Sequence, residues 1–210
     1  MSETSELLLV RHGETEWSRN GRHTSWTDKP LTAHGEREAE GVRELLAGRD
    51  IALALSSPMS RAVRTAELAG LKDVRTDPDL HEWDYGGYEG ETSDEISRTR
   101  PGWFLFDDGV PPGPSGHPGE TPAEVGARAD RVLARIGPRL GQPGAGDVVL
   151  VAHGHFLRVL TARRLGLPPS AGALFRLDTG TVSRLGTEHG RPALLAWNGR
   201  VAAGGRGAGA

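Results

Sequence analysis

Short apolar runs that end in a histidine–glycine pair constrain the fold of this chain more than any other feature. Residues 7–10 read LLLV and are followed by RHG, and residues 147–152 read DVVLVA and are followed by HGH. Residues 52–57, ALALSS, form a third run of similar character. Runs of about four to eight mainly apolar residues are typical of strands that are buried on both faces, as in a parallel sheet. We therefore expect these segments to form strands of one central sheet.

Helical patterns lie between the apolar runs. Residues 121–140 begin with Thr121 as a candidate N-cap, Pro122 at the first helical position and Glu124 where it completes a capping box. Strands that alternate with helices predict an α/β fold with a mostly parallel sheet. Further helices are expected over residues 32–47, 58–70 and 156–166, and further short strands over 174–177, 181–185 and 193–197.

The length of 210 residues is that of one domain, and the chain has no internal repeat. We assign a single domain to residues 1–200 and expect residues 86–120 to form an insertion or lid. Residues 109–122 are rich in proline and glycine, and a loop of this length in a compact domain is usually functional or mobile. Residues 201–210, VAAGGRGAGA, are expected to form a disordered tail.

Composition excludes several kinds of site and partner. The chain has no cysteine, which removes disulfides, thiolate zinc sites and cysteine nucleophiles, and which fits a reducing compartment. The formal net charge of −3 gives no indication of a basic surface that would bind nucleic acid. The first ten residues, MSETSELLLV, have no basic region and only a short apolar run, so they predict neither a signal peptide nor a membrane span. We expect a cytoplasmic protein that binds neither nucleic acid nor membrane.

Each histidine–glycine pair comes directly after a predicted strand, at the end where open α/β sheets bind their ligands. Arg11 and His12 follow the first run, and His153 follows the last. Arg61 lies in the first turn of the helix after the 52–57 run, and helix N-termini favour anions. Two histidines and two arginines at one edge of a sheet predict a phosphoryl-transfer pocket that requires no metal and no cofactor.

In such a pocket, His12 would attack phosphorus and become a phosphohistidine, while His153 stabilises the charge that develops on the phosphoryl group. Arg11 and Arg61 would bind the phosphoryl oxygens, because a guanidinium matches phosphate in a bidentate way. The other interpretation of HGH, a metal pair formed by His153 and His155, lacks a third ligand at a suitable spacing.

The reaction also needs a proton donor for the leaving alkoxide. The stretch LHEWDYGGYEG, residues 80–90, offers Glu82, Asp84 and Glu89. We favour Glu82, which lies just ahead of the turn-rich part of this stretch. A general acid of this kind is typically worth ~10²–10⁴ in rate.

Aromatic and histidine side chains near these motifs leave two interpretations open. Trp103, Phe104 and Phe106 either form part of a roof that sets substrate choice or pack the insertion onto the main body. His23 and His155 either line the mouth of the pocket or are structural.

The segment LVRHGETEW, residues 9–17, resembles the signature of the histidine phosphatase superfamily in its phosphoglycerate mutase-like branch. The similarity continues through SSPMSRAVRTAEL, LHEWDYGGYEGET and VVLVAHGHFLRVL. The resemblance implies a three-layer αβα sandwich and a phosphohistidine at His12. It also implies that Thr24 lies over the substrate and that Ser18, where many relatives have asparagine, contacts it. The expected site consists of catalytic His12, Glu82 and His153, with substrate contacts from Arg11, Ser18, Thr24, Arg61 and Gly154.

The branch of the superfamily decides the reaction. A phosphoglycerate mutase needs a fixed cation for the substrate carboxylate, because burying that group unpaired is costly. Residues 83–109 contain only Arg98 and Arg100 as basic residues. We therefore expect a phosphomonoesterase for a small phosphorylated metabolite, similar to bacterial acid phosphatases and to sedoheptulose bisphosphatases. A phosphoglycerate mutase, a sugar bisphosphatase and a phospho-ligand binding module without catalysis are the alternatives. Exposed strands near the C-terminus could pair two copies into a homodimer.

Overall fold

A central sheet of six strands organises the computed structural model, which describes residues 5–201. The strand order is β3-β2-β4-β1-β5-β6, and β1 to β4 run parallel while β5 and β6 are antiparallel to their neighbours. The strands are β1 (Leu7–Arg11), β2 (Ile51–Ser56), β3 (Arg75–Thr76), β4 (Asp147–Ala152), β5 (Val182–Glu188) and β6 (Arg191–Gly199). The predicted mostly parallel sheet is confirmed, and each of the three apolar runs forms one of its strands.

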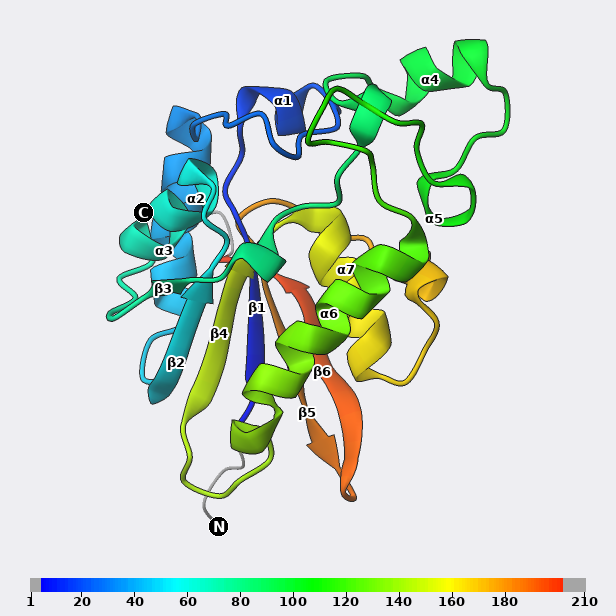
Figure 1. The fold of residues 1–210 in the computed structure, drawn as a ribbon. Coiled ribbons are helices and arrows are strands. Elements are labelled where there is room, and N and C mark those ends of the chain that lie inside the picture. Colours follow the sequence, from blue (N-terminus) through cyan, green and yellow to red (C-terminus); the bar gives the residue numbers. More distant parts are fainter. Residues whose placement is uncertain (1–4, 202–210) are drawn as a thin grey trace, which may run out of the picture.

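Helices cover both faces of this sheet, which makes the fold the expected three-layer αβα sandwich (Figure 1). Along β1, Leu7 and Leu9 pack into the core on one face, and Leu8 and Val10 pack into the core on the other. All four side chains are fully buried, which explains why the run is continuously apolar. The first core is covered by α6 (Pro122–Ile136) and α7 (Gly154–Arg164), and the second by α2 (Ala33–Leu45) and α3 (Ser60–Leu68).

Short helices lie where β1 and β4 end. They are α1 (Glu16–Arg19), α4 (Ser93–Thr99) and α5 (Leu105–Asp108). Figure 1 shows α1 and α4 beyond this edge of the sheet, with the connecting loops around them. The sequence pattern did not predict them, because helices of four to seven residues are too short to show a period. No helix in residues 5–201 is long and apolar enough to cross a membrane.

The structure corrects one predicted strand. Leu174 ends the 3₁₀ segment Pro169–Leu174, and residues 175–177 are irregular. The backbone carbonyls of this region accept side-chain hydrogen bonds instead of pairing in the sheet: Leu177 accepts from Arg11, and Ala173 accepts from Arg158.

Two predicted helix starts also move. The helix expected from residue 58 begins at Ser60 with Met59 as its N-cap, and the helix expected from residue 156 begins at Gly154. The earlier start of α7 has a physical cause, because a carboxylate from elsewhere in the chain accepts hydrogen bonds from its first turn, as described below. Residues 202–210 of the predicted tail lie outside the described residues.

Candidate functional site

His12 directly follows β1 and is held by the backbone of the neighbouring strand. Its N–H donates to the carbonyl of Ala152 (3.0 Å), and its side chain is buried with 5% exposed. The ring Nδ1 lies 2.8 Å from the carbonyl oxygen of Gly13, an acceptor, so Nδ1 carries the proton and Nε2 has a free lone pair. Burial, reinforced by the nearby Arg61 and Arg11 guanidinium groups, holds the pKa of His12 well below 6.5. The ring is therefore neutral, and its free nitrogen is available as a nucleophile.

His153 follows β4, and its ring centroid lies 5.1 Å from that of His12. Its Nδ1 accepts a hydrogen bond from Arg61 Nε (3.3 Å), so the proton lies on Nε2, which donates to the hydroxyl of Ser57 (2.7 Å). Burial and the adjacent Arg61 lower the pKa of His153 well below 6.5. The two histidines thus meet at one sheet edge, in opposite tautomers.

Arg61 lies in the first turn of α3, as predicted, and is fully buried. Besides its contact to His153, its guanidinium donates to the carbonyls of Ser25 (2.9 Å) and Thr27 (3.2 Å). Burial lowers the pKa of Arg61. Arg61 therefore joins the loop after α1 to the His153 ring.

Arg11 ends β1 and brings an unpaired donor to the site. Its Nη1 donates to the carbonyl of Leu177, whereas its Nε is buried without a hydrogen-bond partner in residues 5–201. Burial lowers the pKa of Arg11. A Cβ at Gly154 would lie 3.2 Å from Arg11 Cζ, so the glycine leaves room for the guanidinium against α7. A buried N–H of a cation without an acceptor is costly, which makes this atom a candidate donor to an anion.

Glu82 is the carboxylate that accepts hydrogen bonds from the first turn of α7. Its Oε1 accepts from the N–H groups of Trp83 (2.9 Å) and Phe156 (2.8 Å), and its Oε2 accepts from that of His155 (3.0 Å). A carboxylate at a helix N-terminus accepts hydrogen bonds from free N–H groups, and its negative charge interacts favourably with the helix dipole. Only 5% of Glu82 is exposed, and it faces the cavity described below.

Ser18 and Thr24 come from the segment after β1. Ser18 forms a reciprocal capping box with Thr15 at the start of α1, and its hydroxyl accepts from the Thr15 N–H (2.9 Å). The Thr24 hydroxyl donates to the carbonyl of Arg22 (3.0 Å). Both hydroxyls are thereby oriented by local backbone.

Gly13 and Gly35 bring the loop after β1 against the first turn of α2. A Cβ on Gly13 would collide with the Gly35 carbonyl, and a Cβ on Gly35 would collide with the Glu14 backbone. The Gly13 N–H also donates to the Thr65 hydroxyl of α3 (3.1 Å). Gly13 therefore permits close contact between two backbones.

A cavity of about 180 Å³ lies at the end of the sheet, and His12 and Glu82 are part of its wall. Of the predicted site residues, Arg61 and His153 do not line it and lie behind its wall. The predicted residues that line it are Arg11, His12, Ser18, Thr24, Glu82 and Gly154. The other two carboxylates considered as proton donors do not line it: Asp84 accepts from the backbone of Gly86, and Glu89 from that of Ser25.

Sequence reasoning missed Arg22 and Arg158, and both line the cavity, as does Tyr85. The Tyr85 hydroxyl lies 2.6 Å from Nδ1 of His155, which also lines it together with His23. Arg158 could have been found from its position four residues after Gly154, because such spacing places two residues on one helix face.

None of the three aromatic residues of the 103–106 segment lines the cavity, and Phe104 is exposed. Trp103 and Phe106 are buried, with 8% and 2% exposed, and belong to the core under α6 and α7. Phe106 contacts the Trp83 ring edge-to-face and lies under the Arg158 guanidinium. The interpretation that these two residues pack the 86–120 segment onto the main body agrees with this geometry.

The family model for the histidine phosphatase superfamily (branch 1) matches residues 7–200 of this chain. An acid phosphatase of Mycobacterium tuberculosis is 39% identical over 186 residues, which cover 88% of this chain and 87% of that protein. A sedoheptulose 1,7-bisphosphatase of Saccharomyces cerevisiae is 36% identical over 193 residues, covering 78% of this chain and 69% of that protein. The solved structure of an open-reading-frame product of Mycobacterium tuberculosis superposes with a TM-score of 0.85 at 37% identity, over 93% of this chain and 98% of that one.

Proposed function

This chain belongs to the histidine phosphatase superfamily, as its motifs predicted, and on that premise we propose that it is a metal-independent phosphomonoesterase for small phosphorylated metabolites. One observation carries the proposal. The neutral, buried His12 has an unprotonated Nε2 and lines a cavity that is also lined by Arg11, whose Nε is buried without a hydrogen-bond partner in residues 5–201. A nucleophile beside an unsatisfied cationic donor suits a phosphate ester.

The proposed reaction has two displacements at phosphorus. Nε2 of His12 forms a bond to phosphorus as the ester P–O bond breaks, and the leaving alkoxide takes a proton from the Glu82 carboxyl group. Water then attacks the phosphohistidine and gives its proton to Glu82, and the N–P bond breaks to release inorganic phosphate. One carboxyl group serves both steps, first as general acid and then as general base.

The remaining predicted residues act on the phosphoryl group in this proposal. Arg11 binds its oxygens through its guanidinium, which lies against Gly154 at a place where a Cβ would crowd it. Ser18 and Thr24 contact the substrate from the α1 side of the cavity. His153, whose Nδ1 is bound by Arg61, stabilises the charge that develops in the transition state when its Nε2–H turns from the Ser57 hydroxyl to a phosphoryl oxygen.

Two cations of the cavity wall favour a sugar bisphosphatase as a second candidate. Arg22 and Arg158 line the cavity in addition to Arg11, whereas Arg98 and Arg100, considered from sequence, do not. A second anionic group on the substrate would find a partner there. The similarity to a sedoheptulose bisphosphatase supports the same candidate.

The test is release of inorganic phosphate by the purified protein from glycerol phosphate, sugar monophosphates, sugar bisphosphates and 3-phosphoglycerate. We expect turnover that a chelator leaves unchanged, because arginine and histidine supply the charge that a metal would otherwise provide. Preference for bisphosphates would select the second candidate. Phosphoryl transfer from bisphosphoglycerate without phosphate release would show a mutase instead, and loss of activity with chelator would contradict the metal-independent mechanism.

The other sequence predictions about the chain's surroundings stay predictions. They are a cytoplasmic location, the absence of nucleic-acid and membrane partners, and a homodimer through the C-terminal strands. The assignment of residues 1–200 to one domain and of 86–120 to a lid is likewise a proposal. The chemistry described above requires none of them.

A further inference from the structure

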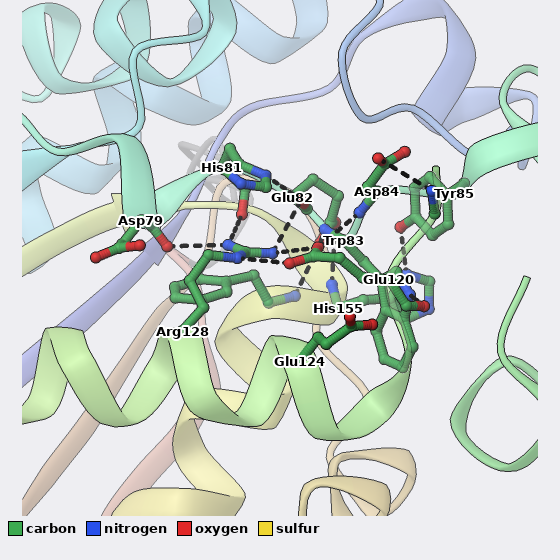
Figure 2. A network of polar contacts seen from close by, with 12 residues as sticks. Asp79, His81, Glu82, Trp83, Asp84, Tyr85, Glu120, Glu124, Arg128 and His155 are labelled. Carbon is green, nitrogen blue, oxygen red and sulfur yellow. Dashed lines mark hydrogen bonds and ion pairs between the residues drawn. The ribbon is translucent and has the colours of Figure 1, made fainter. Parts of the chain in front are cut away.

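Arg128 of α6 makes an unusually complete set of hydrogen bonds beneath the candidate site (Figure 2). It is 3% exposed, and each of its five N–H groups has an acceptor. Nη1 donates to the carbonyls of Asp79 (2.9 Å) and His81 (2.6 Å), and Nη2 donates to that of Glu82 (3.2 Å). Three of its five bonds therefore go to the backbone that carries Glu82.

The other two bonds of Arg128 go to Glu120, at the end of the proline- and glycine-rich loop. Nε and Nη2 bind its two carboxylate oxygens at 2.9 and 2.6 Å, a bidentate pair. Glu120 in turn accepts from the N–H of Asp84 (2.9 Å) and, through its own carbonyl, from the Trp83 indole (2.8 Å). Figure 2 shows Arg128 reaching from α6 toward the segment that carries Asp79, His81 and Glu82, with Glu120 beside its guanidinium.

We propose that Glu120 and Arg128 are positioning residues for Glu82. This inference rests on the proposed function, in which Glu82 donates the proton to the leaving group. Two elements fix the Glu82 carboxylate: the first turn of α7 binds its oxygens, and the Glu120–Arg128 pair holds its backbone. The planar guanidinium of Arg128 has five N–H groups in fixed directions, so it can bind three carbonyls and a carboxylate at once. A lysine ammonium has three N–H groups and cannot make all of these bonds.

Positioning by this pair predicts a specific kinetic signature. A general acid matters for an alkyl phosphate, whose alkoxide is a poor leaving group, and matters little for p-nitrophenyl phosphate, whose leaving group departs without a proton. Displacing Glu82 should therefore slow the alkyl ester selectively. A residue that only stabilises the fold would change both substrates together.

The experiment compares Arg128→Lys and Glu120→Gln with the parent protein. For each, kcat/KM is measured with glycerol phosphate and with p-nitrophenyl phosphate, because kcat/KM reports the steps up to phosphoenzyme formation. The ratio of the two values cancels the fraction of protein that is folded. We expect both variants to lower the ratio of glycerol phosphate to p-nitrophenyl phosphate by about 10- to 100-fold, since a displacement of about 1 Å can cost this much.

Arg131→Lys is the matched control. Arg131 lies three residues further along α6 and also contacts Asp79, but it is exposed and binds the side-chain carboxylate (2.6 Å) instead of the backbone. Its variant should keep the parent ratio.

Glu82→Gln separates failure of this inference from failure of the proposed function. If Glu82→Gln lowers the ratio but Arg128→Lys and Glu120→Gln leave it within about twofold of the parent, the positioning role is wrong and the acid role stands. If Glu82→Gln itself leaves the ratio unchanged, Glu82 is not the proton donor and the proposed mechanism fails at that residue.

Discussion

The two sides of the cavity are built in different ways. His12 and His153 follow neighbouring parallel strands whose last residues, Arg11 and Ala152, are paired in the sheet. Glu82 lies in no strand, and its backbone is held by Arg128, some 46 positions away in the sequence. The histidine side is thus placed by backbone hydrogen bonds, and the carboxylate side by side chains. Substitutions within β1 and β4 should therefore displace the site less than substitutions of the side chains that hold Glu82.

Removal of the nucleophile, on the histidine side of the cavity, should have the largest effect on kcat. We expect His12→Ala to lower kcat for phosphate release by roughly 10⁴-fold or more, because His12 forms the covalent intermediate of the proposed reaction. Rapid quenching and mass spectrometry should detect a phosphorylated parent protein and an unmodified variant. Turnover equal to that of the parent in a folded His12→Ala protein would disprove the nucleophile assignment.

Arg61→Lys should rank next. A lysine cannot keep the Nε bond to His153 together with the bonds to the carbonyls of Ser25 and Thr27, so the His153 ring loses its fixed tautomer. We expect kcat to fall by about 10²–10³-fold, as when one transition-state donor is lost. Arg64→Lys, three residues along the same helix at an exposed ion pair, is the control and should retain activity. Equal effects of the two changes would show that Arg61 acts only through helix stability.

The pH dependence tests the buried histidines. His12, His153 and His155 have pKa values well below 6.5 because of burial, so His12 stays unprotonated as the pH falls below 6.5, and kcat/KM should not decline in that range on its account. The unfolded chain does bind protons there. Stability should therefore be complete above pH 6.5 and decrease as the pH falls below it, by up to about 1.4 kcal/mol per pH unit for each histidine.

Urea unfolding across this pH range and kcat/KM on the same samples measure both effects. A loss of kcat/KM with a midpoint near pH 6.5, without loss of folded protein, would contradict a neutral and buried His12.

Thr121→Ala should have the smallest effect on kcat/KM, and it tests whether the start of α6 influences the carboxylate side of the cavity. Thr121 caps α6 in a reciprocal box with Glu124 and directly follows Glu120. Loss of the cap should lower the free energy of unfolding by about 0.5–2 kcal/mol. Because Arg128 lies two turns inside the helix, we expect kcat/KM with glycerol phosphate to stay at the parent value. A selective loss with this substrate would show that fraying of the helix start reaches Glu82.

The same contrast explains what the sequence could predict. Apolar runs, helix caps and histidine–glycine pairs are local patterns, and they located β1, β4, the start of α6 and the two histidines. Glu82 was singled out because the leaving alkoxide needs a proton donor and because the segment around it resembles the histidine phosphatase superfamily. Nothing local distinguishes Arg128 from the exposed Arg131 of the same helix, because the difference arises only when three carbonyls from residues 79–82 reach one of them.

The cavity wall shows a further limit of sequence reasoning. Arg61 was expected to bind phosphate directly, yet its donors reach loop carbonyls and the His153 ring, contacts that depend on how the 24–27 loop folds back over α3. No local pattern marked Arg22 or Arg158 as a cavity residue, although Arg158 lies in the segment VVLVAHGHFLRVL that resembles the family. Their presence in the wall follows from the path of the chain, which a pattern of residue types does not contain.

The contact of Gly13 with Gly35 limits how this enzyme could change. Main chain lies on main chain there, so no side-chain volume separates the nucleophile's loop from α2. The spacing between them cannot be adjusted by mutation in small increments, and new substrate preferences would have to arise on the opposite, side-chain-built wall.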